Sequence, residues 1–84
     1  MFEKGAVVRS LAGRDSGRLL AVVRVSGGRV WLCDGKERPL NRPKSKNIRH
    51  VVPIGTVLNE SELAGNRVLK KTLGRIDAHF NGNM

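Results

Sequence analysis

The chain has 84 residues, which supply enough apolar material for one small core and exclude two independently folding domains. Sixteen Lys and Arg residues outnumber seven Asp and Glu residues, and the resulting net charge of +9 favours a polyanionic partner. The single cysteine excludes a disulfide framework and a cysteine zinc site, and no apolar run has the length of a membrane span.

Three short runs rich in aliphatic and β-branched residues predict the first three strands. They cover residues 6–10, 19–25 and 29–33, and the Ser-Gly-Gly sequence at 26–28 is a compact hairpin connection between the last two. The run at 19–25 is apolar on both alternating faces except at Arg24, which is typical of a strand covered on both sides. We therefore expect a further element to cover the outer face of the sheet.

The next part of the chain is interpreted from its turn residues. The Asp-Gly pair at 34–35 predicts a two-residue hairpin turn into a fourth short strand over residues 36–40. Residues 41–47 are polar and basic without a hydrophobic period, so we expect a connector there, and residues 48–52 are a candidate fifth strand closed by Pro53. Four or five short strands joined by tight loops indicate a small β-barrel or sandwich.

After Pro53 the pattern becomes helical. Asn59 and Glu62 have the spacing of a capping box, which predicts the start of a helix. On a helical wheel the apolar arc holds Leu69, Leu73, Ile76 and Phe80, and a separate basic arc holds Arg67, Lys70, Lys71 and Arg75. We expect a barrel over residues 1–53 and a C-terminal helical extension over residues 54–84, with a frayed end at 81–84.

Residues 12–18, AGRDSGR, form a glycine-punctuated loop between the first two predicted strands. Its glycines are free to adopt positive φ, so the loop can bring backbone amides and two arginines up to a phosphate group. Its carboxylate would brace an arginine or the turn itself. The candidate phosphate-binding residues are Gly13, Arg14, Asp15, Gly17 and Arg18. The alternative is an ordinary turn with solvated charges.

Most of the positive charge lies in the first two-thirds of the chain. Residues 1–53 hold twelve Lys or Arg against four Asp or Glu, whereas residues 54–84 hold four against three. A second basic strip can track phosphates, and each neutralised phosphate adds roughly 0.7 to 0.9 to the salt slope of binding. The strip consists of Arg38, Arg42, Lys44, Lys46 and Arg49. The alternative is a mobile, solvated loop.

Other aromatic and polar residues give weaker indications. Trp31 could stack on a base, but the scarcity of rings favours a packed position in the barrel. His50 and His79 are far apart and lack clustered acids or thiols, so no metal site is expected, although His50 could contact RNA beside Arg49. The chain has no P-loop, no His-Glu-x-x-His motif and no nucleophile with a base at recognisable spacing. We therefore expect neither catalysis nor a cofactor.

Residues 5–18, GAVVRSLAGRDSGR, resemble the KOW motif. The longer run to Val52 is similar to small KOW-domain RNA-binding proteins related to the ribosomal protein L14e group. The similarity lies in the AGRDSGR loop, the Asp-Gly turn, and the proline and lysine stretch before His50 and Val51. It implies an SH3-like barrel of about five strands that binds structured RNA, with family members on the large ribosomal subunit.

By position, the resemblance implies RNA contacts on the first loop and, more loosely, on Arg42, Lys44 and Lys46; it does not extend to residues from Ile54 onward. Its main implication is a protein of the ribosome or another ribonucleoprotein, which binds rRNA or another structured RNA. The lone cysteine and the lack of a membrane span or signal peptide lead us to expect a cytoplasmic protein, which we also expect to be noncatalytic and a monomer when free. Contacts with ribosomal proteins would accompany a role in translation. The alternative is a transcription-elongation-type KOW module that docks a polymerase or a ribosomal protein. Binding to duplex DNA is a third hypothesis.

Overall fold

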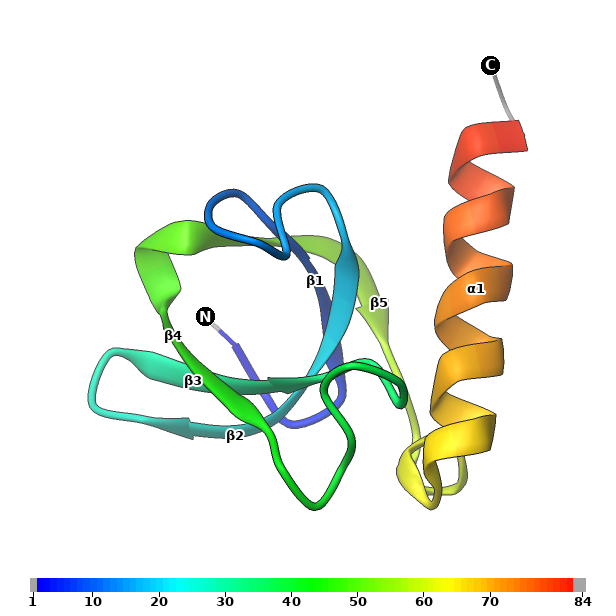
Figure 1. Ribbon diagram of the computed structural model, residues 1–84, viewed down its shortest axis with the longest axis horizontal. Helices are drawn as coiled ribbons and strands as arrows, with labels where there is room; N and C mark the ends of the chain where they lie inside the picture. Colours follow the sequence, from blue (N-terminus) through cyan, green and yellow to red (C-terminus); the bar gives the residue numbers. More distant parts are fainter. Residues whose placement is uncertain (1, 83–84) are drawn as a thin grey trace.

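The computed structural model describes residues 2–82 of the chain. One antiparallel sheet with the strand order β4-β3-β2-β1-β5 curls into a small barrel, and helix α1 stands beside it (Figure 1). The strands are β1 (Ala6–Ser10), β2 (Leu19–Ser26), β3 (Arg29–Cys33), β4 (Lys44–Asn47) and β5 (Val51–Val57). The helical elements are the short 3₁₀ helices η1 (Ile48–His50) and η2 (Glu60–Leu63), and α1 (Asn66–Gly82). The predicted mainly β fold, a small barrel of five strands with a C-terminal helix, is therefore confirmed.

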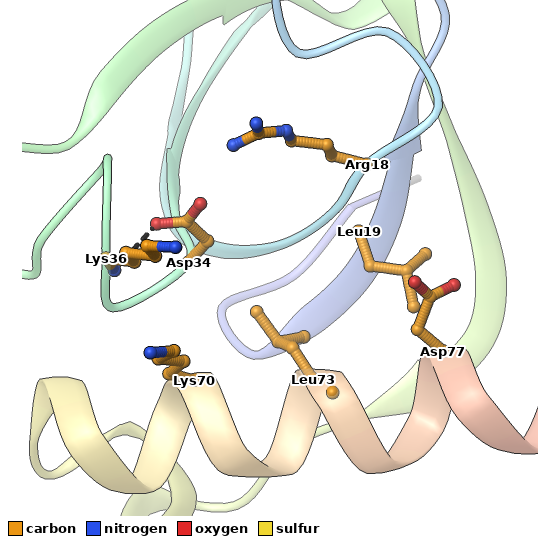
Figure 2. Close-up of a pocket in the computed structure, with 8 residues that line it drawn as sticks. Arg18, Leu19, Asp34, Lys36, Lys70, Leu73 and Asp77 are labelled. Atoms are coloured by element: carbon orange, nitrogen blue, oxygen red, sulfur yellow. Dashed lines mark hydrogen bonds between the residues drawn. The ribbon is translucent and has the colours of Figure 1, made fainter.

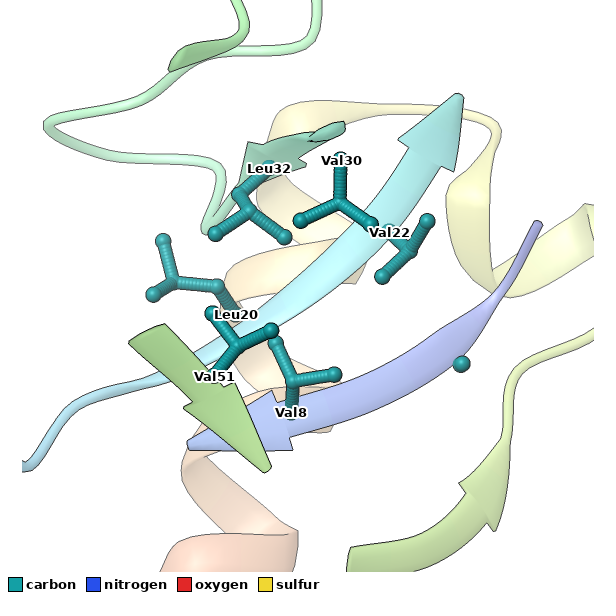
Figure 3. Close-up of a cluster of buried hydrophobic side chains, with 7 residues drawn as sticks. Val8, Leu20, Val22, Val30, Leu32 and Val51 are labelled. Carbon is teal, nitrogen blue, oxygen red and sulfur yellow. The ribbon is translucent and has the colours of Figure 1, made fainter. Parts of the chain in front are cut away.

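One face of the sheet forms the interior of the barrel. Successive side chains of a strand face opposite sides, so alternate residues of neighbouring strands meet in register. Val8 is paired with Leu20, and Val22 with Leu32, across adjacent strands. Figure 3 shows these side chains in one buried cluster with Val51 of β5. The interior is thus built from aliphatic side chains, as the composition indicates.

The opposite face of the sheet is covered by α1. Val7, Ala21 and Cys33 occupy paired positions on three adjacent strands and are buried. They belong to one cluster with Leu69 and Leu73 of α1. Burying each of these leucines contributes roughly 1.5–3 kcal/mol of hydrophobic stabilisation. The prediction that a further element covers the sheet is therefore confirmed.

The predicted hairpin turn at Asp34-Gly35 and the predicted strand over residues 36–40 are wrong. Gly35 has a φ of +80°, but among the described residues only glycines have a positive φ, so Asp34 cannot complete the expected turn. The Asp34 side chain instead accepts hydrogen bonds from the backbone amides of Lys36 and Arg38, at 2.9 and 2.8 Å. The turn is also closed by the Asp34 and Gly35 amides, which donate to the Arg38 carbonyl at 2.9 and 3.3 Å, and no strand forms at 36–40.

Two further boundaries differ from the prediction. β4 lies within residues 41–47, where a connector was expected; it is an edge strand paired only with β3, a position in which lysines are common. The expected strand at 48–52 begins as η1, and β5 then continues through Pro53 to Val57. The predicted boundary after residue 53 thus falls inside β5, which tolerates Pro53 because it forms the other edge of the sheet.

The capping box is confirmed, but it caps a different helix from the one expected. The Asn59 amide donates to the Glu62 side chain at 2.9 Å, and the Glu62 amide donates to the Asn59 side chain at 3.0 Å. This box begins η2, whereas α1 begins later, at Asn66. We expected the apolar arc of the helix to pack on the barrel; Phe80 on this arc is 45% exposed, so for this residue the expectation is wrong. The predicted frayed end is helical as far as Gly82, and residues 83–84 lie outside the described residues.

Candidate nucleic-acid interface

The loop between β1 and β2 is closed by backbone hydrogen bonds. The Ser10 amide donates to the Arg18 carbonyl at 3.0 Å, and the Gly17 amide donates to the Ser10 carbonyl at 2.8 Å. Gly13 and Gly17 have φ values of +78° and +85°, in the left-handed region that glycine adopts without strain. The glycine-punctuated sequence therefore forms a defined turn.

The loop uses several of its amides internally. The Ser16 amide donates to the Gly13 carbonyl at 3.1 Å, and the Arg18 amide donates to the Asp15 carbonyl at 2.9 Å. Together with Gly17, these groups are already satisfied and have no free proton for a phosphate oxygen. The capacity of the loop to bind an anion therefore rests mainly on its arginine side chains.

Asp15 connects this loop to the segment that leads into β4. Its side chain is 3% exposed and lies 3.5 Å from the guanidinium of Arg38 and 3.7 Å from the ammonium of Lys44. A buried carboxylate needs compensating charge, which these two cations supply. Asp15 is thus placed to position cations rather than to touch a ligand. This placement matches its interpretation as a brace.

Lys46 anchors the loop from β4. Its ammonium donates to Ser10 Oγ at 2.8 Å and to the Ala12 carbonyl at 2.7 Å, and the residue is only 8% exposed. Burial lowers the pKa of Lys46; the nearby Asp15 opposes this effect, and two neighbouring cations add to it. The Lys46 ammonium is therefore committed to the loop, and we assign it a positioning role.

Three arginines of the loop and the connector, Arg14, Arg18 and Arg42, have exposed side chains. Arg14 and Arg42 are exposed, and within residues 2–82 their side chains make no ion pair or hydrogen bond. Arg18 lies 3.0 Å from Glu37 in a half-exposed ion pair, which ties the loop to the segment after β3. Pairs exposed to this degree contribute little to stability, so Arg18 can exchange Glu37 for another anion at small cost.

Arg49 lies on η1, which borders the same loop. The Leu11 amide, at the start of the loop, donates to the His50 carbonyl at 2.8 Å. Ser10 is also paired with Val51 in the sheet. Both contacts place η1 beside the loop, and Arg49 is exposed there.

The structure thus gathers most of the predicted site residues at one end of the barrel. Gly13, Arg14, Asp15, Gly17 and Arg18 belong to the loop, Arg38, Lys44 and Lys46 contact it or its buried acid, and Arg49 lies on η1 beside it. Arg42 is not brought to the loop: its backbone amide donates to the Pro39 carbonyl, near the start of α1. We call the partly or fully exposed cations of the gathered set, Arg14, Arg18, Arg38, Lys44 and Arg49, the basic end.

Trp31 is part of a separate feature on the β2–β3 hairpin. The Arg24 guanidinium lies 4.7 Å from the centroid of the Trp31 ring, in a cation–π contact. The ring is partly buried on β3, as the preferred interpretation expects. Because Arg24 covers one face of the ring, that face is not open to a base.

Lys36 and Lys70 are far apart in the sequence, and no periodic sequence pattern groups them. Lys36 follows the Asp34-Gly35 turn and Lys70 lies on α1, yet both line one cleft with Arg18 (Figure 2). The sequence signal for this juxtaposition is Gly35, whose backbone approaches α1 more closely than any side chain would allow.

Comparisons with known proteins add no assignment. No family model matches the chain, and no curated protein sequence matches it. In the part of the chain that the structure describes, no three His, Cys, Asp or Glu side chains are grouped so as to hold a metal ion. None of the helices described is long and apolar enough to cross a membrane.

Proposed function

We propose that the protein is a noncatalytic RNA-binding module that contacts the phosphate backbone of a structured RNA through the basic end. The arrangement around Asp15 carries the proposal: one buried carboxylate holds Arg38 and Lys44 beside the loop that bears Arg14 and Arg18. Arginine is suited to this role because its planar fork binds phosphate oxygens bidentately. The resemblance of residues 5–52 to KOW domains supports rRNA as the RNA class and the cytoplasm as the site of action.

The surface chemistry favours recognition of shape and phosphate over recognition of bases. Single-strand binding proteins stack successive bases on aromatic side chains. Among residues 2–82, no rings form such a platform at the basic end: Arg24 covers one face of Trp31 on the β2–β3 hairpin, and Phe80 lies edge-on to His79 on α1. Double-stranded RNA is recognised mainly through its backbone and groove shape, which suits a cluster of cations without a stacking platform.

A salt titration of RNA binding tests the proposal. The wild-type protein should bind a stem-loop RNA with an affinity that falls steeply as salt rises, because each phosphate contact adds roughly 0.7–0.9 to the slope. The double variant Arg14→Ala/Arg49→Ala should lose about 1.4–1.8 from that slope and bind roughly tenfold more weakly at about 0.15 M salt. Both side chains are exposed, so the melting temperature should not change.

The matched control is Arg67→Ala/Lys71→Ala, which removes the same charge from exposed positions on α1. It should retain most of the wild-type slope. A slope near zero for the wild-type protein, or equal losses in the two double variants, would contradict the proposal. If a duplex DNA competes as well as the RNA for the protein, the function is DNA binding instead.

Docking to a protein, as in transcription-elongation KOW modules, is a second candidate. An apolar cleft of about 460 Å³ lies between Thr56 and the α1 residues Ile76 and Phe80, and none of the basic-end residues lines it. Gel filtration with purified ribosomes and with RNA polymerase separates the two functions. Salt-insensitive co-elution with polymerase that is lost in Phe80→Asp would favour the protein-docking function.

A further inference from the structure

A cleft separates α1 from the turn that follows β3. It has a volume of about 180 Å³ and is lined by the cations Arg18, Lys36 and Lys70, the acids Asp34 and Asp77, and Leu73 among others. Figure 2 shows the three cationic side chains arriving from the β1–β2 loop, the 34–38 turn and α1. Three separate segments of the chain therefore place positive charge around one opening.

The turn and α1 are held against each other by backbone contacts. A Cβ atom added at Gly35 would collide with the Asn66 carbonyl oxygen and lie 3.0 Å from the Lys70 amide nitrogen, so the turn lies directly on the first turns of α1. The Leu40 amide also donates to the Asn66 side chain at 2.7 Å. Since Lys36 follows Gly35 immediately, the positions of Lys36 and Lys70 relative to each other are set by this docking.

The two acids at the cleft have partners elsewhere in the chain, although Asp77 Oδ1 is buried without a hydrogen bond within residues 2–82. Asp34 accepts the hydrogen bonds from two backbone amides that shape the turn, and the Asp77 carboxylate lies 3.6 Å from the guanidinium of Arg9. Lys36 and Lys70, in contrast, make no ion pair among the described residues. The cleft thus has two ammonium groups available for an incoming anion, and Arg18 adjoins them.

We infer that this cleft binds one backbone phosphate of the RNA, so that the contact surface continues from the basic end onto α1. The inference rests on the proposed function, because the RNA strand must first be held at the basic end. Arg18 belongs to both places and would be the point at which the strand passes from one to the other. A phosphodiester fits the site because its single negative charge is shared by two non-bridging oxygens, which can accept from ammonium groups on opposite walls.

The double variant Lys36→Ala/Lys70→Ala tests the inference against the control Arg67→Ala/Lys71→Ala. Both variants remove two exposed cations, and only the first pair lines the cleft. With a stem-loop RNA, the cleft variant should lose about 0.7–0.9 from the salt slope and bind roughly three- to tenfold more weakly at about 0.15 M salt. The control should change the slope by less than half that amount.

The possible failures are distinguishable. If the wild-type protein binds RNA with a steep slope but the cleft variant and the control have the same slope, the inference is wrong and the proposed function stands. If the wild-type slope is itself near zero, the proposed function fails as well. Thermal melting of both variants confirms that folding is unchanged, because none of the four side chains is buried.

Discussion

The carboxylate of Asp15 lies 3.5 Å from the guanidinium of Arg38, although the two residues belong to different loops. The contact joins the loop that resembles a KOW motif to the irregular segment that follows β3. It also explains how an acid can serve a basic surface: a buried negative charge fixes positive groups that would otherwise repel one another.

Replacing Asp15 with Asn should destabilise the fold by about 1–3 kcal/mol. The change keeps the shape of the side chain but leaves Arg38 and Lys44 without their compensating charge, and both are partly exposed, which limits the loss. Urea denaturation measures the effect. Asp77→Asn is the control: its side chain is 43% exposed, and its pairing with Arg9 should contribute at most about 1 kcal/mol.

RNA binding by Asp15→Asn tests whether Asp15 acts by positioning Arg38 and Lys44 or only through the net charge of the protein. Asp15→Asn raises the net positive charge by one, so a simple charge effect would strengthen binding. If Asp15 positions Arg38 and Lys44, binding should weaken instead. Tighter binding by Asp15→Asn would show that the geometry around this acid is unimportant.

Gly35→Ala should destabilise the protein by at least about 2 kcal/mol more than Gly28→Ala. Both glycines have nearly the same φ, +80° and +78°, so the conformational cost of alanine is matched. Only at Gly35 does the added methyl group meet the backbone of α1, whereas nothing lies within 4 Å of it at Gly28. Chemical denaturation of the two variants measures the difference, and equal losses would contradict the close docking of the turn on α1.

Leu69→Ala should cost about 2–5 kcal/mol, because Leu69 is fully buried between α1 and the sheet. The neighbouring Val68 is 45% exposed, so Val68→Ala should change the free energy of unfolding by less than about 1 kcal/mol. Urea unfolding monitored at Trp31 reports on the barrel itself. If Leu69→Ala left that transition unchanged, α1 would not support the sheet.

Cys33 should make the folded state progressively less stable as the pH rises from 9.0 to about 11. Burial raises the pKa of this thiol from 9.0 to about 11, and the adjacent Asp34 raises it further toward that value. In this interval the unfolded chain loses the proton and the folded protein keeps it, so the free energy of unfolding decreases by about 1.4 kcal/mol per pH unit. Below pH 9.0 the thiol makes no pH-dependent contribution.

The comparison with Cys33→Ala isolates this effect. Lys46 acts in the opposite direction: its lowered pKa makes the fold more stable as the pH rises toward 10.5. Both proteins retain Lys46, so the difference between their unfolding free energies reports on the thiol alone. A difference that stays constant from pH 8 to 11 would contradict burial of Cys33 as a neutral thiol.

The sequence predicted the strands that are apolar on alternating or both faces. Residues 6–10, 19–25 and 29–33 were assigned almost to the residue, because the burial of Val8 and Val22 on one side and Val7 and Ala21 on the other leaves a clear pattern. The need for a covering helix followed from the same pattern. These features depend on local periodicity, which a single sequence contains.

The fourth strand was missed because its pairing is set by tertiary contacts. Residues 44–47 are Lys-Ser-Lys-Asn, which have no strand propensity of their own. They are extended because β3 offers a free edge and because Lys46 reaches the Ser10 hydroxyl across the barrel. For the same reason the separation of the basic residues into exposed ones and buried braces such as Asp15 and Lys46 could not be predicted from their spacing.

Strands β1 and β2 serve two cores at once, and this limits how the protein can be shortened. A fragment ending at Val57 would keep every strand but would expose Val7, Leu19, Ala21 and Cys33 to water as one continuous apolar surface. Such a fragment would self-associate, and this non-specific association could be mistaken for binding to a partner. The barrel and its helix are therefore a single indivisible unit for any attempt to find a minimal binding fragment.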